Sequence, residues 1–293
     1  MSIQLALATD AAHPGVYPDD AHFVATLARL GVHGVPCTWN DLDVDWTRFD
    51  AVLVRTVWDY FQRHPEFLHW LDQLDALGVP TVNDSRLLRW NSDKRYLLEL
   101  ARLGVDIIPT RLAHTAELPA TLQALQAQEV VVKPAVSGGA WRTLRGTAGD
   151  AAFAQAVAAL PEGDWLVQPF VAEIQRDGEW SLLFFDGDYS HAVRKLPKPG
   201  DYRVQGEHGG SVELAEAPAP ALAAAQAVLA AVARAGHAET AYARIDGVMQ
   251  GGRFLLMEAE LIEPFLHLAM RPDAAERYAE RLAARLANRV RRP

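Results

Sequence analysis

The 293-residue chain carries 28 Lys and Arg against 37 Asp and Glu, a formal net charge of −9 at pH 7. At about 150 residues per domain, this length favours roughly two compact domains. The acidic balance argues against a general nucleic-acid-binding protein, and the single Cys37 excludes an intrachain disulfide framework and a CxxC metal site. Without a basic leader or a long apolar stretch, the sequence favours a cytoplasmic protein with no membrane span.

Short apolar segments alternate with amphipathic ones over the first ninety or so residues. We expect strands at 3–8, around Val35 and at 51–54, and helices at 23–30 and 67–74. This alternation predicts a parallel sheet with right-handed crossovers, in which the ligand crevice lies at the carboxyl ends of the strands. The residues expected at those ends are the candidate substrate contacts: Asp10, Arg55, Trp58, Asp59 and Tyr60. The alternative is local, with Trp58 and Tyr60 as packing residues and Asp59 as a helix cap.

Beyond residue 90 further helices and strands follow, and the pattern becomes antiparallel in character from about residue 165. The helices are expected at 91–103, 119–128, 151–160 and 222–232, the strands at 107–110, 130–134 and 165–170, and the hairpins at 180–195 and 242–260. The chain contains no GxxxxGK[ST], GxGxxG, HExxH or GxSxG motif in a matching context. A candidate site therefore has to come from charged residues in segments that are otherwise apolar.

Lys133 ends a run of three valines and precedes the loop that contains Ser137, Gly138 and Gly139. The backbone N–H groups of a glycine loop can point at phosphate oxygens without side-chain obstruction, and a neighbouring lysine adds positive charge. The alternative is a lysine that reaches solvent at a strand end. Lys94, near an expected helix start, is a weaker second candidate for a phosphate ligand, because most helical lysines are solvated.

Three carboxylates belong to two strands that are expected to pair. Asp246 lies in one apolar strand, and Glu258 and Glu260 alternate in the next, so the two-residue period puts both glutamates on one face. A turn near Gly251 brings them close to Asp246. Three carboxylates repel one another unless they share a cation, and Mg²⁺ takes oxygen ligands of this type. The sequence favours a metal site here, and the alternative is an exposed acidic strand end.

A basic segment follows the expected hairpin at 180–195. It contains Arg194, Lys195 and Lys198, and then Arg203. Guanidinium groups match phosphate oxygens in two-point contacts, so the segment suits a triphosphate bridged to a metal ion. The alternative is that these cations only balance the charge of the acidic residues.

These segments, in this order, resemble the ATP-grasp superfamily from about residue 91 to residue 260. The resemblance rests on NSDK at 91–94, VVKP at 131–134, WLVQPFV at 165–171, GEWS at 178–181, RID at 244–246 and EAE at 258–260. It implies an α/β fold in which an N-terminal parallel domain precedes two α+β subdomains that clamp ATP. The implied domains are residues 1–90 for the substrate, 91–170 with the glycine loop, and 171–293 with the metal site.

The resemblance also implies roles for individual residues. The phosphates would be held by Lys94, Lys133 and Arg203, under a lid formed by Ser137, Gly138 and Gly139. The adenine would be framed by Gln168, Phe170 and Val171, and the ribose held by Glu179. Arg194 belongs to a segment similar to that of ligases that add glutamate to a ribosomal protein. One or two Mg²⁺ ions, with Mn²⁺ as an alternative, would bind to Asp246, Glu258 and Glu260. The implied catalytic residues are Arg244, which would face the developing oxyanion, Arg203 and Lys133.

Two departures from the family pattern affect what can be transferred. Glu260 stands where the family has an asparagine, which adds negative charge and favours two cations. Ser181 stands where the glutamate ligases carry an arginine, so their substrate is not transferred to this chain. The segments at 55–60, 178–181 and 260–264 look most like the branch with a glutathione-synthetase-type ATP-binding domain. That branch includes the cyclo-ligase that closes O-ureidoserine to cycloserine.

The implied activity is that of an ATP-dependent carboxylate–amine ligase forming a C–N bond. It would act through an acyl phosphate on a small amino-acid-like substrate, with intramolecular ring closure as one form of the reaction. The expected partners are a small-molecule carboxylate and an amine-type nucleophile, without nucleic acid or membrane, and a homo-oligomer is left open. One alternative is an ATP-grasp kinase, which stops at phosphoryl transfer. The other is a regulatory protein that binds ATP without turnover.

Overall fold

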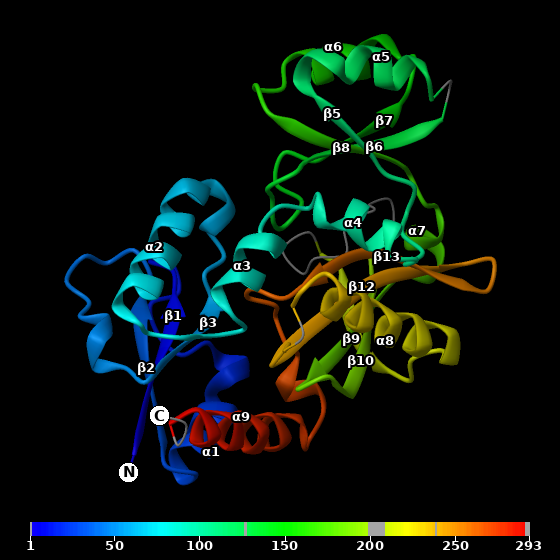
Figure 1. Cartoon of the computed structure of the whole chain (residues 1–293). Helices are drawn as coiled ribbons and strands as arrows, with labels where there is room; N and C mark the ends of the chain where they lie inside the picture. The colour runs from blue at the N-terminus through cyan, green and yellow to red at the C-terminus, as the bar shows by residue number, and fades with distance from the viewer. Residues whose placement is uncertain (1, 126–127, 199–208, 238, 291–293) are drawn as a thin grey trace.

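The computed structural model describes residues 2–125, 128–198, 209–237 and 239–290. Figure 1 shows an N-terminal sheet, a small sheet at the far end of the molecule, and a central sheet between them. The first sheet is parallel and the other two are antiparallel, which confirms the predicted combination of a parallel α/β part with two α+β parts. Within the described residues, no helix is long and apolar enough to cross a membrane.

The N-terminal sheet has the strand order β2-β1-β3-β4. Its strands are β1 Ile3–Thr9, β2 Val32–Thr38, β3 Ala51–Thr56 and β4 Thr81–Val82. Its helices are α1 Ala21–Arg29, α2 His64–Leu77 and α3 Ser85–Asn91, with single 3₁₀ turns at Pro18–Asp20, Trp46–Arg48 and Tyr60–Gln62. All residues of β3 are buried, as expected for a parallel strand covered on both faces.

The small sheet is antiparallel in the order β5-β8-β6-β7, and its helices cover one face (Figure 1). It consists of β5 Arg111–His114, α5 Leu118–Gln123, β6 Glu129–Pro134, β7 Leu144–Thr147, α6 Ala151–Ala158 and β8 Asp164–Pro169, with a 3₁₀ turn at Thr115–Glu117. Val130 and Val132 of β6 pack with Phe153 of α6 in its core. Successive residues of a strand point to opposite faces, so Lys133, which follows Val132, lies on the other face of the sheet, toward the central sheet.

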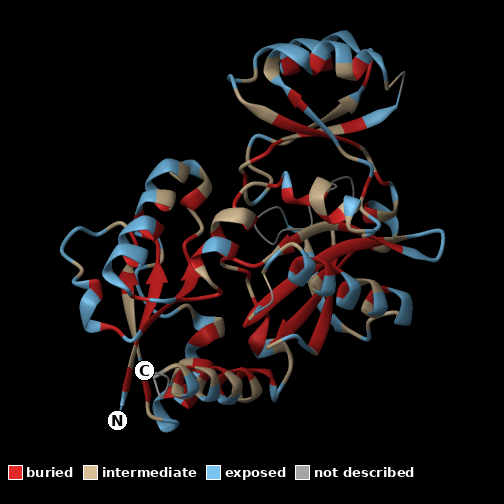
Figure 2. Ribbon diagram, in the orientation of Figure 1, coloured by how far each residue is buried: buried red, intermediate tan, exposed pale blue. Residues whose placement is uncertain are grey.

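The central sheet runs in the order β11-β10-β9-β12-β13, and its strands β9 and β12 are buried over most of their length, drawn red in Figure 2. Its elements are α4 Tyr96–Arg102, α7 Glu173–Asp177, β9 Glu179–Phe185, β10 Asp188–Leu196, β11 Ser211–Ala215, α8 Ala219–Arg234, β12 Tyr242–Gln250 and β13 Arg253–Glu260. Leu182 of β9 faces the apolar side of α8, whereas Leu183 faces the N-terminal part. This alternation leaves the second face of the sheet available for polar side chains.

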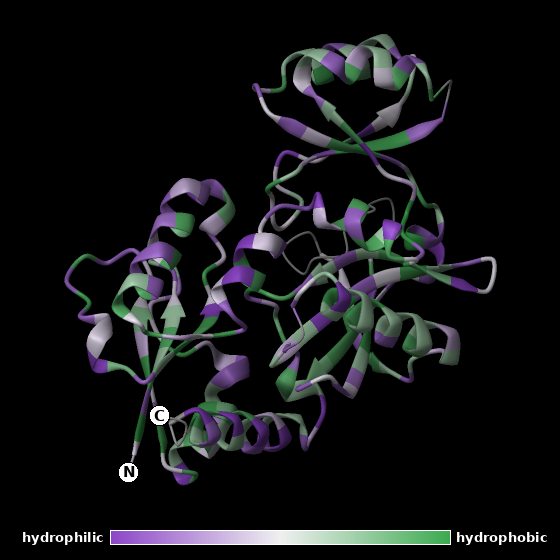
Figure 3. Cartoon of the chain, viewed as in Figure 1, coloured by the Kyte–Doolittle hydropathy of each residue, from purple (hydrophilic) through white to green (hydrophobic). Residues whose placement is uncertain are grey.

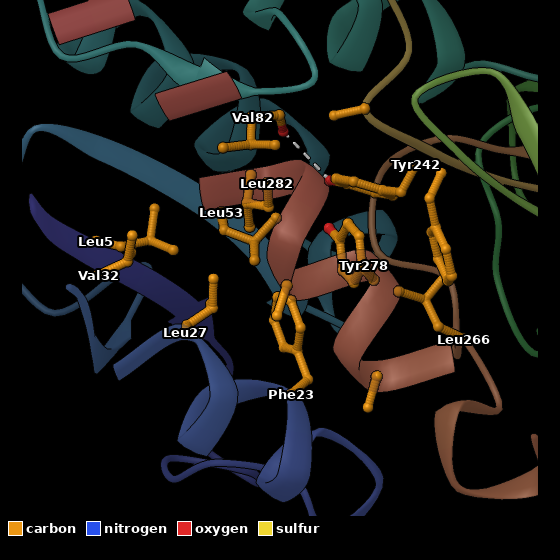
Figure 4. Close-up of a cluster of buried hydrophobic side chains, with 14 of the residues drawn as sticks. Leu5, Phe23, Leu27, Val32, Leu53, Val82, Tyr242, Leu266, Tyr278 and Leu282 are labelled. Carbon is orange, nitrogen blue, oxygen red and sulfur yellow. Dashed lines mark hydrogen bonds between the residues drawn. The ribbon is translucent and has the colours of Figure 1, made fainter. Parts of the chain in front are cut away.

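The last helix, α9 Ala274–Val290, returns to the N-terminal domain and packs against α1. Its Tyr278 ring stacks on Phe23 of α1 with the centroids 4.5 Å apart (Figure 4). It also stacks on Phe185 of β9 at the same centroid distance. Figure 3 shows the mixture of hydrophilic and hydrophobic residues expected of an amphipathic helix. A short 3₁₀ turn at Leu268–Met270 leads into it. The N-terminal and central sheets consequently share one apolar core.

The helix predicted at 91–103 is helical only over α4, because Asn91 ends the preceding helix α3 and a turn at 92–95 separates the two. The Asn91 amide donates to the Ala259 carbonyl at 2.7 Å and accepts from the Leu261 N–H at 2.9 Å. These contacts fix the end of α3 against β13 and stop the helix there. Lys94 consequently lies in the turn, where its N–H donates to the Ala135 carbonyl at 2.7 Å.

Candidate active site

A cavity of about 630 Å³ lies where the three parts of the chain meet. Its lining includes the following residues predicted from sequence: Trp58, Tyr60, Lys94, Lys133, Ser137, Gly138, Gly139, Gln168, Glu179, Arg244, Asp246, Glu258 and Glu260. They come from segments separated by up to two hundred residues, so only the tertiary structure could bring them together. The volume falls in the range of small-molecule sites, about 300–1,000 Å³.

Two lysines provide positive charge at the glycine-loop side of the cavity. Lys94 pairs with Glu258, Nζ to Oε1, at 2.8 Å and also donates to the Ser137 carbonyl. Lys133, at the end of β6, makes no ion pair or side-chain hydrogen bond with any described residue. Burial lowers the pKa of Lys133 to about 8. Lys133 thus has no anionic partner among the described residues, and a bound phosphate group would supply one.

The three predicted metal ligands lie on one wall, in the paired strands β12 and β13. Asp246 pairs with Glu258 in the sheet register, next to a shift that leaves Met257 as an extra residue. Their carboxylates are paired with cations: Arg244 donates to both Asp246 and Glu260, and Lys94 contacts Glu258. Within the described residues, no group of three or more acidic, His or Cys side chains is arranged to hold a metal ion. The all-oxygen donor set suits Mg²⁺, and the ligand assignment remains a prediction.

The ion pairs set the protonation of these acids. Asp246 is buried, but Arg244 and Lys195 outweigh the burial and hold the pKa of Asp246 well below its usual range. Burial raises the pKa of Glu260 to about 7, with Asp246 adding to the rise against the opposing charge of Arg244. Burial also raises the pKa of Glu179, although Lys195 donates to that carboxylate at 2.9 Å. The wall is a connected network in which one new charge would shift several protonation equilibria.

The residues predicted for the nucleoside divide into two groups. Gln168 and Glu179 line the cavity, and the Gln168 amide is fixed by donation to Thr110 Oγ1 at 2.8 Å. Phe170 and Val171 do not line it: Val171 packs in a small apolar core with Ile174, and the Arg145 guanidinium lies 3.4 Å from the Phe170 ring centroid.

The outcome differs for Arg194 and Arg203, the two arginines predicted as phosphate ligands. Arg194 is not part of its lining, because its Nη2 pairs with Glu213 Oε1 on the neighbouring strand β11 at 2.6 Å. Arg203 lies outside the described residues. Lys195, the neighbour of Arg194, takes the position on the cavity wall instead, because successive residues of a strand point to opposite faces.

The glycine loop is closed by contact with the N-terminal domain. A Cβ at Gly138 would lie 2.7 Å from Cε1 of Phe61, so only glycine fits there without displacing the ring. Phe61 also meets Trp141 of the same loop at a centroid distance of 5.6 Å. Both rings line the cavity, and neither was predicted from the sequence.

The N-terminal substrate candidates have different positions. Trp58 and Tyr60 line the cavity, whereas Arg55, Asp10 and Asp59 are not part of its lining. Arg55 is buried in an ion pair with Asp20, Asp10 accepts from the His13 N–H at 2.7 Å, and Asp59 accepts from Trp39 Nε1 at 2.8 Å. The Asp10 and Asp59 carboxylates are used within the domain, whereas Arg55 also donates to the Pro264 carbonyl at 3.4 Å.

Glu263 is a cavity residue that the candidate set from the sequence omits. In the sequence, the segment 260–264 served only to mark the resemblance to the glutathione-synthetase-type branch. That resemblance is the signal that could have identified Glu263. Burial, followed by the charge of Glu260, raises the pKa of Glu263 to about 8. Phe265 lines the same part of the cavity.

Comparison with known proteins gives a consistent result. Residues 5–83 match the family model of the D-cycloserine synthetase DcsG N-terminal domain. Over 297 residues the chain is 35% identical to the cycloserine biosynthesis protein DcsG of Streptomyces lavendulae, covering 96% of this chain and 98% of that protein. The crystal structure of D-cycloserine synthetase DcsG superposes with a TM-score of 0.86 at 33% identity, covering 97% of this chain and 99% of the other. The D-alanine–D-alanine ligase of Bacillus anthracis complexed with ATP shares the fold, with a TM-score of 0.66 at 17% identity and 99% of each chain covered.

Proposed function

This chain belongs to the family of ATP-grasp ligases that includes the cycloserine biosynthesis protein DcsG, and we propose that it closes a small amino-acid-like substrate onto its own carboxylate. It is an ATP-dependent ligase forming C–N bonds. The observation that carries the proposed substrate class is the similarity to DcsG over nearly the whole of both chains. The convergence of Lys94, Lys133 and the three acids on one cavity supports the same assignment. The first substrate to test is O-ureidoserine.

The reaction begins with attack of the substrate carboxylate on the γ-phosphorus of ATP, which forms an acyl phosphate and releases ADP. Both reactants are anionic, so the protein has to align them and neutralise their charge. Lys133 and Lys94 would contact the phosphates, together with backbone N–H groups of the loop that contains Gly138 and Gly139. Mg²⁺, which would be held by Asp246, Glu258 and Glu260, supplies further neutralisation of phosphate charge when it is bound. A role for Arg203 at the phosphates stays part of the proposal.

In the second step a substrate nitrogen attacks the acyl carbon, and inorganic phosphate leaves. Negative charge develops on the carbonyl oxygen, and a fixed guanidinium stabilises it. Arg244 has this role in the proposal, because its side chain is held by Asp246 and by the Phe265 carbonyl at 3.1 Å. The contact of Phe61 with Trp141 keeps the glycine loop closed, which excludes the water that would hydrolyse the acyl phosphate. Gln168 and Glu179 would position the nucleoside.

The test is incubation of the purified chain with ATP, Mg²⁺ and either O-ureido-D-serine or its L enantiomer. We expect ADP release in a 1:1 ratio with a cyclised product identified by mass spectrometry, and loss of both in Lys133→Met. A stable phosphorylated product without a new C–N bond would instead identify an ATP-grasp kinase. ATP binding without ADP release for any carboxylate would identify a regulatory protein and overturn the proposal.

A further inference from the structure

The segment 262–265 has no regular secondary structure, yet its backbone is held from several sides. Each of its four carbonyls accepts a hydrogen bond from a distant side chain: Ile262 from Tyr242 at 2.7 Å, Glu263 from Trp58 at 3.2 Å, Pro264 from Arg55 at 3.4 Å and Phe265 from Arg244 at 3.1 Å. Two donors come from the N-terminal domain and two from β12 of the central sheet. The side chain of Glu263 is consequently presented to the cavity from a fixed backbone.

Glu263 differs from the other acids of the cavity in its pairing. Glu258 pairs with Lys94, Glu179 with Lys195, and Arg244 serves the remaining two carboxylates. The Glu263 carboxyl interacts with its own backbone N–H, but no described cation or other side chain pairs with it. A buried carboxylate without a cation is costly, and burial accordingly raises its pKa to about 8.

Aromatic rings surround the same end of the cavity. Trp58, Tyr60 and Phe265 line the cavity together with Glu263, and Trp58 Nε1 donates to the Glu263 carbonyl at 3.2 Å. Tyr17 supports this group from behind, with its ring 5.0 Å from Trp58 and 5.7 Å from Phe265, centroid to centroid. Aromatic faces attract ammonium groups, and an unpaired carboxylate completes such a site. This end offers a phosphate no unpaired cation among the described residues, whereas a bound ammonium group would favour the ionised form of Glu263.

We propose that Glu263 binds the cationic amino group of the substrate, so that this ligase selects carboxylates that also carry an amine. This inference rests on the proposed function and adds the recognition element of the substrate to it. Holding the amine at the Glu263 end would direct the reacting carboxylate toward Lys94 and Lys133 on the glycine-loop side. Arg55 acts as a positioning residue, since it holds the Pro264 carbonyl and does not line the cavity. Trp58 both holds the Glu263 carbonyl and lines the amine site.

The test compares O-ureido-D-serine with its analogue that lacks the amino group, 3-(ureidooxy)propanoate, by ADP release. For the native protein we expect a kcat/KM that is roughly 10- to 150-fold higher for the amino compound, the size of one hydrogen bond to a charged group. Glu263→Gln should remove this preference through a higher KM for the amino compound, so that the two compounds react with similar kcat/KM. Glu263→Asp should restore part of the preference. The control is Glu162→Gln, at a side chain that is 77% exposed and remote from the cavity lining.

Several outcomes overturn the inference. Equal kcat/KM values for the two compounds on the native protein would do so without any variant, as would a preference that survives in Glu263→Gln. In both cases the ligase function would stand. If the native protein binds ATP but releases no ADP with either compound or with the L enantiomer, the proposed function fails and this inference fails with it.

Discussion

The buried ion pair between Arg55 and Asp20 is expected to stabilise the N-terminal domain rather than to bind substrate. Both side chains are 5% exposed, and Arg55 donates from Nε and Nη2 to the two carboxylate oxygens at 2.9 and 2.8 Å. Burial opposes the charge of the guanidinium, but Asp20 outweighs it and raises the pKa of Arg55. Arg55→Met would leave a buried carboxylate without its partner.

The expected cost of Arg55→Met is about 3–5 kcal/mol in the free energy of unfolding, the range for removal of one partner of a buried pair. At about 2–4 °C per kcal/mol, the melting temperature should fall by roughly 6–20 °C. The double variant Arg55→Met/Asp20→Leu should recover most of this loss, because it removes the orphaned charge together with its partner.

Circular dichroism melts of the native protein, both single variants and the double variant measure these differences, and ADP release measures activity at a temperature where all four are folded. We expect the double variant to lose less than about tenfold in kcat/KM, since only the 3.4 Å bond to the Pro264 carbonyl is missing from the wall. A double variant that is no more stable than Arg55→Met would refute the structural role. Recovery of stability with complete loss of activity would favour direct substrate contact.

Three other predictions concern the cavity. Burial lowers the pKa of Lys133 from 10.5 to about 8, so the unfolded chain binds the proton more tightly between these values and the stability of the native protein should rise from pH 8 to pH 10.5. Lys133→Met should lack this rise in urea midpoints measured across that range, and parallel curves would contradict the assignment. Gly138→Ala should lower kcat/KM for ADP release at least about tenfold, because the new Cβ would lie 2.7 Å from the Phe61 ring. Adding Phe61→Leu should restore part of the rate. Full activity of Gly138→Ala alone would show that the loop need not close. Glu258→Gln should raise the Mg²⁺ concentration for half-maximal activity at least about tenfold, and an unchanged value would exclude Glu258 as a metal ligand.

Local patterns in the sequence were sufficient where the interaction is local. The two-residue period and the turn near Gly251 predicted that Glu258 and Glu260 lie close to Asp246, and the strand register pairs Glu258 with Asp246. Likewise, the valine run placed Lys133 at a strand end before a glycine loop. These inferences depend on residues a few positions apart or on one hairpin, so the backbone geometry of a single element carries them.

Long-range contacts determined the rest. Whether Arg55 faces a substrate or Asp20 depends on which charge the fold brings beside it, and no periodicity in the chain encodes that choice. The same holds for Lys94, which lies in a turn because Asn91 is hydrogen-bonded to the end of β13. It also holds for Glu263, which has no cationic partner among the described residues because the fold pairs Lys94 with Glu258. The sequence pattern therefore predicted most helices and strands and the charged residues that they carry. The partner of each buried charge was settled by packing, because an ion pair depends on distance in space and not on separation along the sequence.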